Sequence, residues 1–60
     1  MNKEEMAREL SIIKKTGSVN MIDRYGVIRV LNELKFYETA TYAAASISNY
    51  VEILKLSEKY

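Results

Sequence analysis

The stretch from Gly17 to Tyr37 constrains the fold more than any other part of the chain, because it holds both glycines of the sequence and a strongly periodic apolar run. Glycine reaches the left-handed conformation that closes a helix without a Cβ clash, so Gly17 predicts the end of a first helix. Asp23 is the preferred N-cap of a second helix, with Asn20 as the alternative start. This second helix, from about Arg24 to Lys35, has a broad apolar face made of Val27, Ile28, Val30, Leu31 and Leu34.

The residues ahead of Gly17 predict the first helix. Asn2 and Glu5 have the spacing of a capping box, and acidic residues in the first turn suit the helix dipole. Lys14 and Lys15 bring the opposite charge to the last turn. The apolar stripe of this helix comprises Met6, Leu10, Ile12 and Ile13.

The C-terminal part of the chain contains neither Gly nor Pro from Phe36 onward, and one set of apolar residues keeps a helical spacing throughout. That spacing is compatible with one long helix. Four residues from Ser46 to Asn49 include three good N-cap residues, which favours two helices over about 37–46 and 49–58. The first apolar stripe comprises Phe36, Ala40, Ala43, Ile47, Tyr50 and Leu54.

A second apolar stripe lies beside the first in the C-terminal region. One small core cannot cover both stripes, so we expect the second to be buried by another copy of the chain. The predicted self-association residues are Tyr42, Ala45, Ile53, Leu56 and Tyr60.

Length and composition set the fold class. Sixty residues make a single small domain, 1–60, with a thin margin of stability. Cysteine and histidine are absent, so neither a disulfide nor the usual zinc ligands can supply the missing stability, and no cofactor or metal is expected. The hydrophobic fraction of 48% is generous for so small a body. We therefore predict an all-α, compact bundle of three to four short helices that is oligomeric.

Several function classes are disfavoured by the same composition. Without histidine or cysteine, the candidates for a base or nucleophile near neutral pH are few, and Glu4, Glu5 and Glu9 fit helix capping better than acid–base work, so an enzyme is not expected. The apolar runs are too short for a membrane span and the N-terminus lacks the pattern of a signal peptide. A cytoplasmic location is the expectation.

A helix-turn-helix interpretation is the functional alternative. The second helix would read DNA with its exposed N-terminal part, which carries Arg24, Tyr25 and Arg29. The net charge of +1 provides little attraction for a polyanion, so nucleic acid is not favoured as a partner.

One resemblance covers roughly residues 12 to 54. The run G-S-V-N-M-I-D, the later F-Y-E and Tyr50 resemble a family of short proteins of unknown function encoded by phages and prophages of Gram-positive bacteria. The resemblance implies a phage or prophage origin, hence the host cytoplasm, and it implies no catalytic residue. We expect a non-enzymatic protein that self-associates and binds a host or phage protein. By analogy with the family that it resembles, the expected consequence of binding is inhibition of a host or defence factor.

Overall fold

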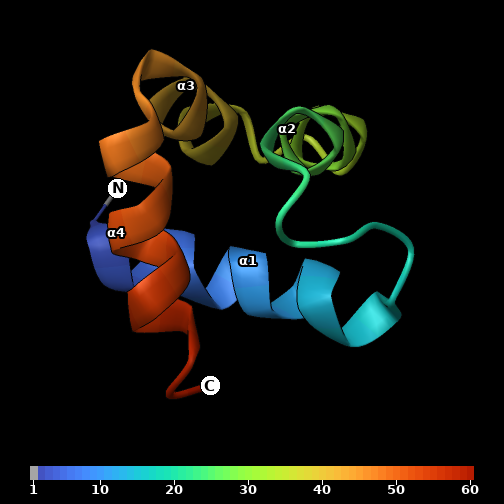
Figure 1. Cartoon of the computed structure of the whole chain (residues 1–60), viewed down its shortest axis with the longest axis horizontal. Helices are drawn as coiled ribbons and strands as arrows, with labels where there is room; N and C mark the ends of the chain where they lie inside the picture. The colour runs from blue at the N-terminus through green and yellow to red at the C-terminus, as the bar shows by residue number, and fades with distance from the viewer. Residues whose placement is uncertain (1) are drawn as a thin grey trace.

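Three of the four helices begin at a side-chain cap. In the computed structural model, which describes residues 2–60, the helices are α1 (Lys3–Thr16), α2 (Arg24–Glu33), α3 (Tyr37–Ala45) and α4 (Ile47–Ser57), as Figure 1 shows. Asn2, Asp23 and Ser46 cap α1, α2 and α4, each accepting a hydrogen bond from the backbone N–H three residues on. The two caps predicted as helix starts, Asn2 and Asp23, are confirmed.

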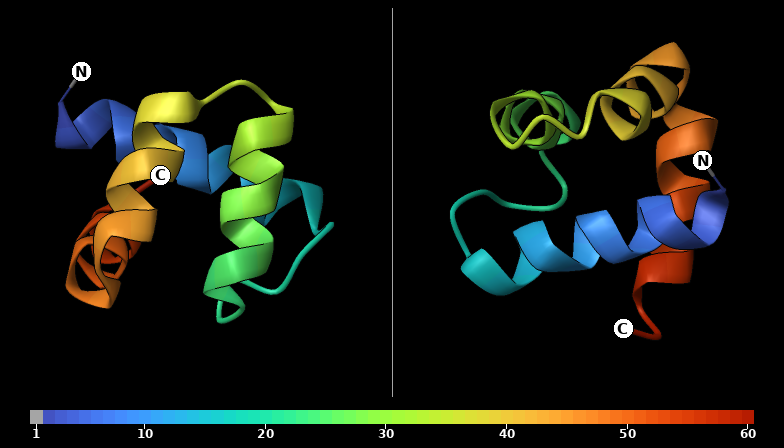
Figure 2. Two further views of the ribbon diagram at one scale, coloured as in Figure 1. Left: turned by 90° about the horizontal axis from the view of Figure 1, so that it is seen from above. Right: turned by 180° about the vertical axis from the view of Figure 1, so that it is seen from behind.

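The helices form two packed pairs. Figure 2 shows α2 and α3 side by side and antiparallel, while α4 crosses α1 steeply in Figure 1, and these are the pairs with the most extensive contacts. The molecule measures 23 × 23 × 19 Å, and no residue from 2 to 60 lies in a strand. The prediction of an all-α compact bundle is confirmed.

The core lies where the two pairs meet. Leu10 and Ile13 of α1, Val27 and Leu31 of α2, and Ile53 of α4 are completely buried. Smaller contributions come from α3, whose Ala40 and Ala43 are buried and allow the neighbouring helices to approach closely.

The end of α2 differs from the prediction. Lys35 was expected to close the helix, but α2 ends at Glu33 and Lys35 adopts a left-handed conformation with φ of 67°. The Phe36 N–H donates to the Leu31 carbonyl at 2.8 Å and the Lys35 N–H donates to the Asn32 carbonyl at 3.0 Å, which is a Schellman motif. This early stop leaves Leu34 45% exposed, so its predicted place on the core face is wrong.

The break between α3 and α4 is a single residue. Ser46 has an extended backbone, with φ of −162° and ψ of 156°, and its hydroxyl accepts from the Asn49 N–H at 3.1 Å. The preference for two helices is confirmed, although α4 begins two residues before the predicted start at 49. Because the chain changes direction at Ser46, Ile47 leaves the first apolar stripe and is 65% exposed.

Gly26 is buried at the first turn of α2, where side chains crowd its α-carbon. A Cβ there would lie 2.5 Å from the Asp23 Oδ2 atom and 2.8 Å from the Val19 Cγ2 atom. The close approach comes from the N-cap carboxylate and a neighbouring valine, so a larger residue at position 26 would force these side chains to shift.

Candidate interaction surface

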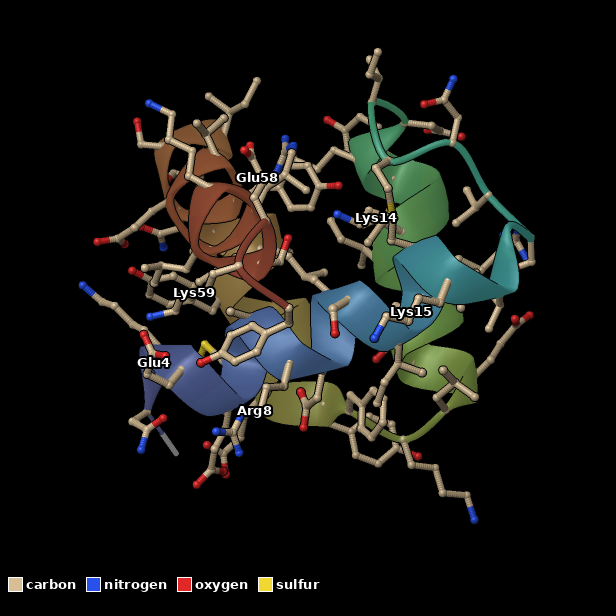
Figure 3. All side chains as sticks on the ribbon, turned by 90° about the horizontal axis from the view of Figure 1, so that it is seen from below. Glu4, Arg8, Lys14, Lys15, Glu58 and Lys59 are labelled. Carbon is tan, nitrogen blue, oxygen red and sulfur yellow. The ribbon has the colours of Figure 1, made fainter. Side chains whose placement is uncertain are left out.

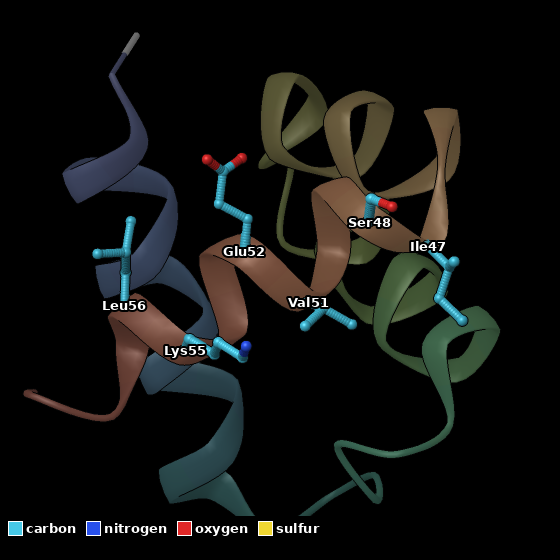
Figure 4. A pocket seen from close by; sticks show the side chains of 6 residues that line it. All are labelled: Ile47, Ser48, Val51, Glu52, Lys55 and Leu56. Atoms are coloured by element: carbon cyan, nitrogen blue, oxygen red, sulfur yellow. The ribbon is translucent and has the colours of Figure 1, made fainter.

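The outer face of α4 carries a shallow, largely apolar groove that is open to solvent. Two ridges run along it, each with residues four apart, and Figure 4 shows the six side chains from outside. We call this surface the α4 outer groove; it is lined by Ile47, Val51 and Lys55 on one ridge and by Ser48, Glu52 and Leu56 on the other. Ile47 is 65% exposed and Val51 39% exposed.

The inner face of α4 explains why this outer face keeps a fixed shape. Ile53 and Tyr50 are buried against the rest of the molecule, and the Tyr50 hydroxyl donates to the Met21 carbonyl at 2.5 Å. Burial, with the nearby Asp23 carboxylate as a second cause, raises the pKa of Tyr50 above its ordinary value. The groove therefore lies on a helix whose position is set by the core.

Glu52 ties the groove to two other helices. Its carboxylate pairs with the Lys3 ammonium at 2.8 Å and accepts from the Tyr42 hydroxyl at 2.5 Å. The hydrogen bond from Lys3, followed by that from Tyr42, lowers the pKa of Glu52, and the same contact with Glu52 raises the pKa of Lys3. Lys55, three residues further, has no ion-pair partner within residues 2–60.

A second apolar hollow lies where α3 meets α1. It is lined by Met6, Tyr37, Glu38, Thr41, Tyr42 and Ala45. Tyr37 is one of the more exposed large side chains of the molecule. Tyr42 lines this hollow and Glu52 lines the α4 outer groove, so their hydrogen bond joins one residue from each surface.

The residues predicted for self-association lie in different environments. Ile53 is completely buried in the core of the single chain, so it has no surface to offer another copy in this fold. Ala45 is exposed, and Leu56 lines the α4 outer groove. Tyr42 and Tyr60 are half-buried, and their hydroxyls donate to Glu52 and Glu4.

Sequence reasoning missed Ile47 and Val51 as surface residues. Ile47 was assigned to the first apolar stripe by counting through Ser46 as though the helix were continuous. The signal that could have placed it outside was Ser46 itself, since a residue directly after an N-cap starts a new helical register. Val51, one turn after Ile47, then follows on the same outer face.

The residues that would read DNA are engaged within the chain. The Arg24 guanidinium donates to the Ala43 carbonyl at 2.8 Å and lies 4.9 Å from the centre of the Tyr25 ring. Arg29 pairs with Glu33 at 3.3 Å, one turn along α2. Tyr25 remains 75% exposed, and α2 packs chiefly on α3 rather than on α1.

The charged groups of α1 and the C-terminal end do not form a face of one sign. Figure 3 shows acidic and basic side chains interspersed across this view, including Glu4, Arg8, Lys15 and Lys59. Glu4 pairs with Lys59 at 2.9 Å and also accepts from Tyr60, whose ring lies 5.2 Å from Arg8. These contacts, led by that with Tyr60, lower the pKa of Glu4.

Two of the carboxylates considered for acid–base chemistry, Glu4 and Glu9, have structural partners. Glu9 of α1 accepts a hydrogen bond from Thr39 of α3, which joins the two helix pairs. Within residues 2–60 there is no group of three or more Asp and Glu side chains placed to hold a metal ion. Nor does any helix in that range have the length and apolar character needed to cross a bilayer.

Comparisons with protein-family models, with curated proteins and with solved structures found no match to this chain.

Proposed function

We propose that this is a non-enzymatic protein-binding domain that presents the α4 outer groove to another protein. The observation that carries the proposal is the exposure of Ile47 and Val51, one helical turn apart on a helix fixed by the core. Neither side chain belongs to the buried cluster, so the packing of the single chain does not explain their apolar character. Apolar residues at this spacing are what one helix uses to pack against another.

The free energy available from burying Ile47 and Val51 is large enough to support a binding role. Complete burial of a Val or Ile side chain is worth about 1.5–3 kcal/mol, and a binding partner that removes the remaining exposed area would gain a large part of that value at each position. Polar and charged residues flank the two aliphatic side chains, as expected for the rim of a binding surface.

The resemblance to short phage and prophage proteins suggests where such a partner would be found. We propose a partner in the bacterial cytoplasm, with a host or phage protein as its class and inhibition of a host or defence factor as the consequence of binding. The DNA-reading alternative receives no support from Arg24 and Arg29, whose guanidinium groups have partners inside the chain.

Affinity capture with matched variants tests this proposal. The protein, its Ile47→Glu/Val51→Glu variant and an Ile12→Glu control would be immobilised and exposed to bacterial lysate. Ile12 is an exposed aliphatic residue of α1 outside the groove, so its variant controls for lost surface hydrophobicity. We expect a protein retained by the parent chain and the control and lost from the double variant. Equal retention by all three would show that binding does not use this surface.

A further inference from the structure

The α4 outer groove has the pattern of a surface that matches itself. We propose that its first occupant is a second copy of this chain, bound through an antiparallel pairing of the two α4 helices about a two-fold axis near Val51 and Glu52. This inference depends on the proposed function, because it names the occupant of the same surface.

The distribution of apolar residues selects the antiparallel arrangement. Ile47 lies at the N-terminal end of one ridge and Leu56 at the C-terminal end of the other, about 14 Å apart along the helix at 1.5 Å per residue. An antiparallel copy brings Leu56 of each chain onto Ile47 of the other, and the ridges of one helix enter the groove of the other. A two-fold interface needs just such a self-complementary patch.

Lys55 is the charged residue that favours this arrangement, while the two Glu52 carboxylates lie on either side of the axis and their repulsion is offset by the ion pair that each makes with Lys3 of its own chain. With the axis between positions 51 and 52, Lys55 of one copy faces Ser48 of the other and lies within one turn of its Glu52. Lys55 has no ion-pair partner within residues 2–60, so its charge is available for this contact. In a parallel pairing, Lys55 would instead face Lys55, which is destabilising for like charges. The net charge of +1 opposes association only weakly.

The area of contact sets the strength of the dimer. A standard interface covers about 800 Å² of each partner, which is about a fifth of the 3771 Å² surface of this protein. Three turns of one helix per copy provide less than that, so the contact belongs among small, transient interfaces of under about 1,200 Å² in total. We expect a dissociation constant of about 10 µM to 1 mM, which leaves the groove available to a tighter partner.

Sedimentation equilibrium from about 10 µM to about 1 mM measures this association directly. We expect the parent chain to convert from monomer to dimer, and Ile47→Glu to weaken dimerisation about tenfold or more, because each dimer loses two buried isoleucines. Glutamate at the first position of α4 suits the helix dipole, so this variant should keep its helical circular dichroism. Ile12→Glu serves as the matched control and should dimerise as the parent does.

The direction of the helices is tested by two changes at one exposed position. Ser48→Glu places a carboxylate opposite Lys55 of the second copy and should strengthen the dimer about three- to tenfold, summed over two symmetric contacts. Ser48→Lys places two ammonium groups opposite each other and should weaken it by a similar factor. A parallel pairing would place residue 48 of one copy opposite residue 48 of the other. Both variants would then bring like charges together and weaken association.

Four results would overturn the inference. They are a monomer at every concentration, a dimer insensitive to Ile47→Glu, equal weakening by both Ser48 variants, and no response to either. The proposed function fails separately, since it is judged by retention of a lysate protein. A strictly monomeric chain that still loses its captured protein in the Ile47→Glu/Val51→Glu variant would reject the dimer and retain the binding role.

Discussion

Replacing Lys35 by glycine should make the protein more stable, because Lys35 is the only non-glycine residue with a positive φ among residues 2–60. An L-residue in the left-handed region is about 1–2 kcal/mol less favourable than in ordinary conformations. Glycine removes that strain but adds about 0.4–1 kcal/mol of unfolded-state entropy. With the middle of each range, the expected net gain in the free energy of unfolding is about 0.8 kcal/mol.

The contacts around Lys35 are made by its backbone, so replacing the side chain should not offset the gain in stability. The Schellman hydrogen bonds join backbone atoms of Lys35 and Phe36 to Asn32 and Leu31, so they survive any change of the side chain. Lys35 is exposed and makes no side-chain hydrogen bond or ion pair in the described structure. Truncation of the side chain should accordingly break no contact.

Thermal and urea unfolding followed by circular dichroism would measure the change. For a domain of this size, 1 kcal/mol corresponds to about 4–8 °C in Tm, so Lys35→Gly should raise Tm by about 2–8 °C. Lys35→Ala is the matched control, because it removes the charge and the long side chain while keeping the Cβ atom, and it should gain little. Equal stability of the glycine and alanine variants would refute the assignment of strain to this position.

Three further changes test other parts of the fold. Tyr50→Phe should lower the free energy of unfolding by about 1–2 kcal/mol in urea titrations, because it leaves the Met21 carbonyl without its donor. Ser46→Ala should cost about 1 kcal/mol by the same measurement through loss of the cap on Asn49, and an unchanged midpoint would contradict that role. Glu52 has a pKa below its ordinary 4.5 in the folded chain, so its stabilising contribution is complete above about pH 4.5 and disappears as the pH falls through the lowered value. The acid side of a pH–Tm profile should therefore fall less steeply in Glu52→Gln than in the parent chain, and parallel profiles would count against the Lys3–Glu52 contact.

The helix starts were predictable from sequence because their causes are local. Asn2 and Asp23 cap helices with their own side chains, and Gly17 closes α1 with φ of 68°, as glycine favours. The end of α2 was not predictable in this way, since a lysine occupies the left-handed position that usually carries glycine. Only the backbone hydrogen bonds reveal that stop.

The surface was harder to predict than the fold, because it depends on how the helices pack. Periodicity placed Ile53 among the residues for self-association, but the crossing of α4 over α1 turns that side chain into the core. The same crossing turns Ile47 and Val51 outward. Periodicity shows which residues share one face of a helix, but the packing of helices distant in the chain determines whether that face is buried or exposed.

The pairing of α1 with α4, and of α2 with α3, also implies an order of assembly. The α2–α3 hairpin closes a turn of about three residues, whereas bringing α4 onto α1 closes about 30, at a cost of roughly 2 kcal/mol more in chain entropy. We therefore expect the hairpin to form early and the two outer helices to meet late. Until α4 packs on α1, Tyr50 and Ile53 on the inner face of α4 are exposed. A partly folded chain would therefore be prone to aggregate through this inner face, whereas the folded chain exposes the α4 outer groove on the opposite face.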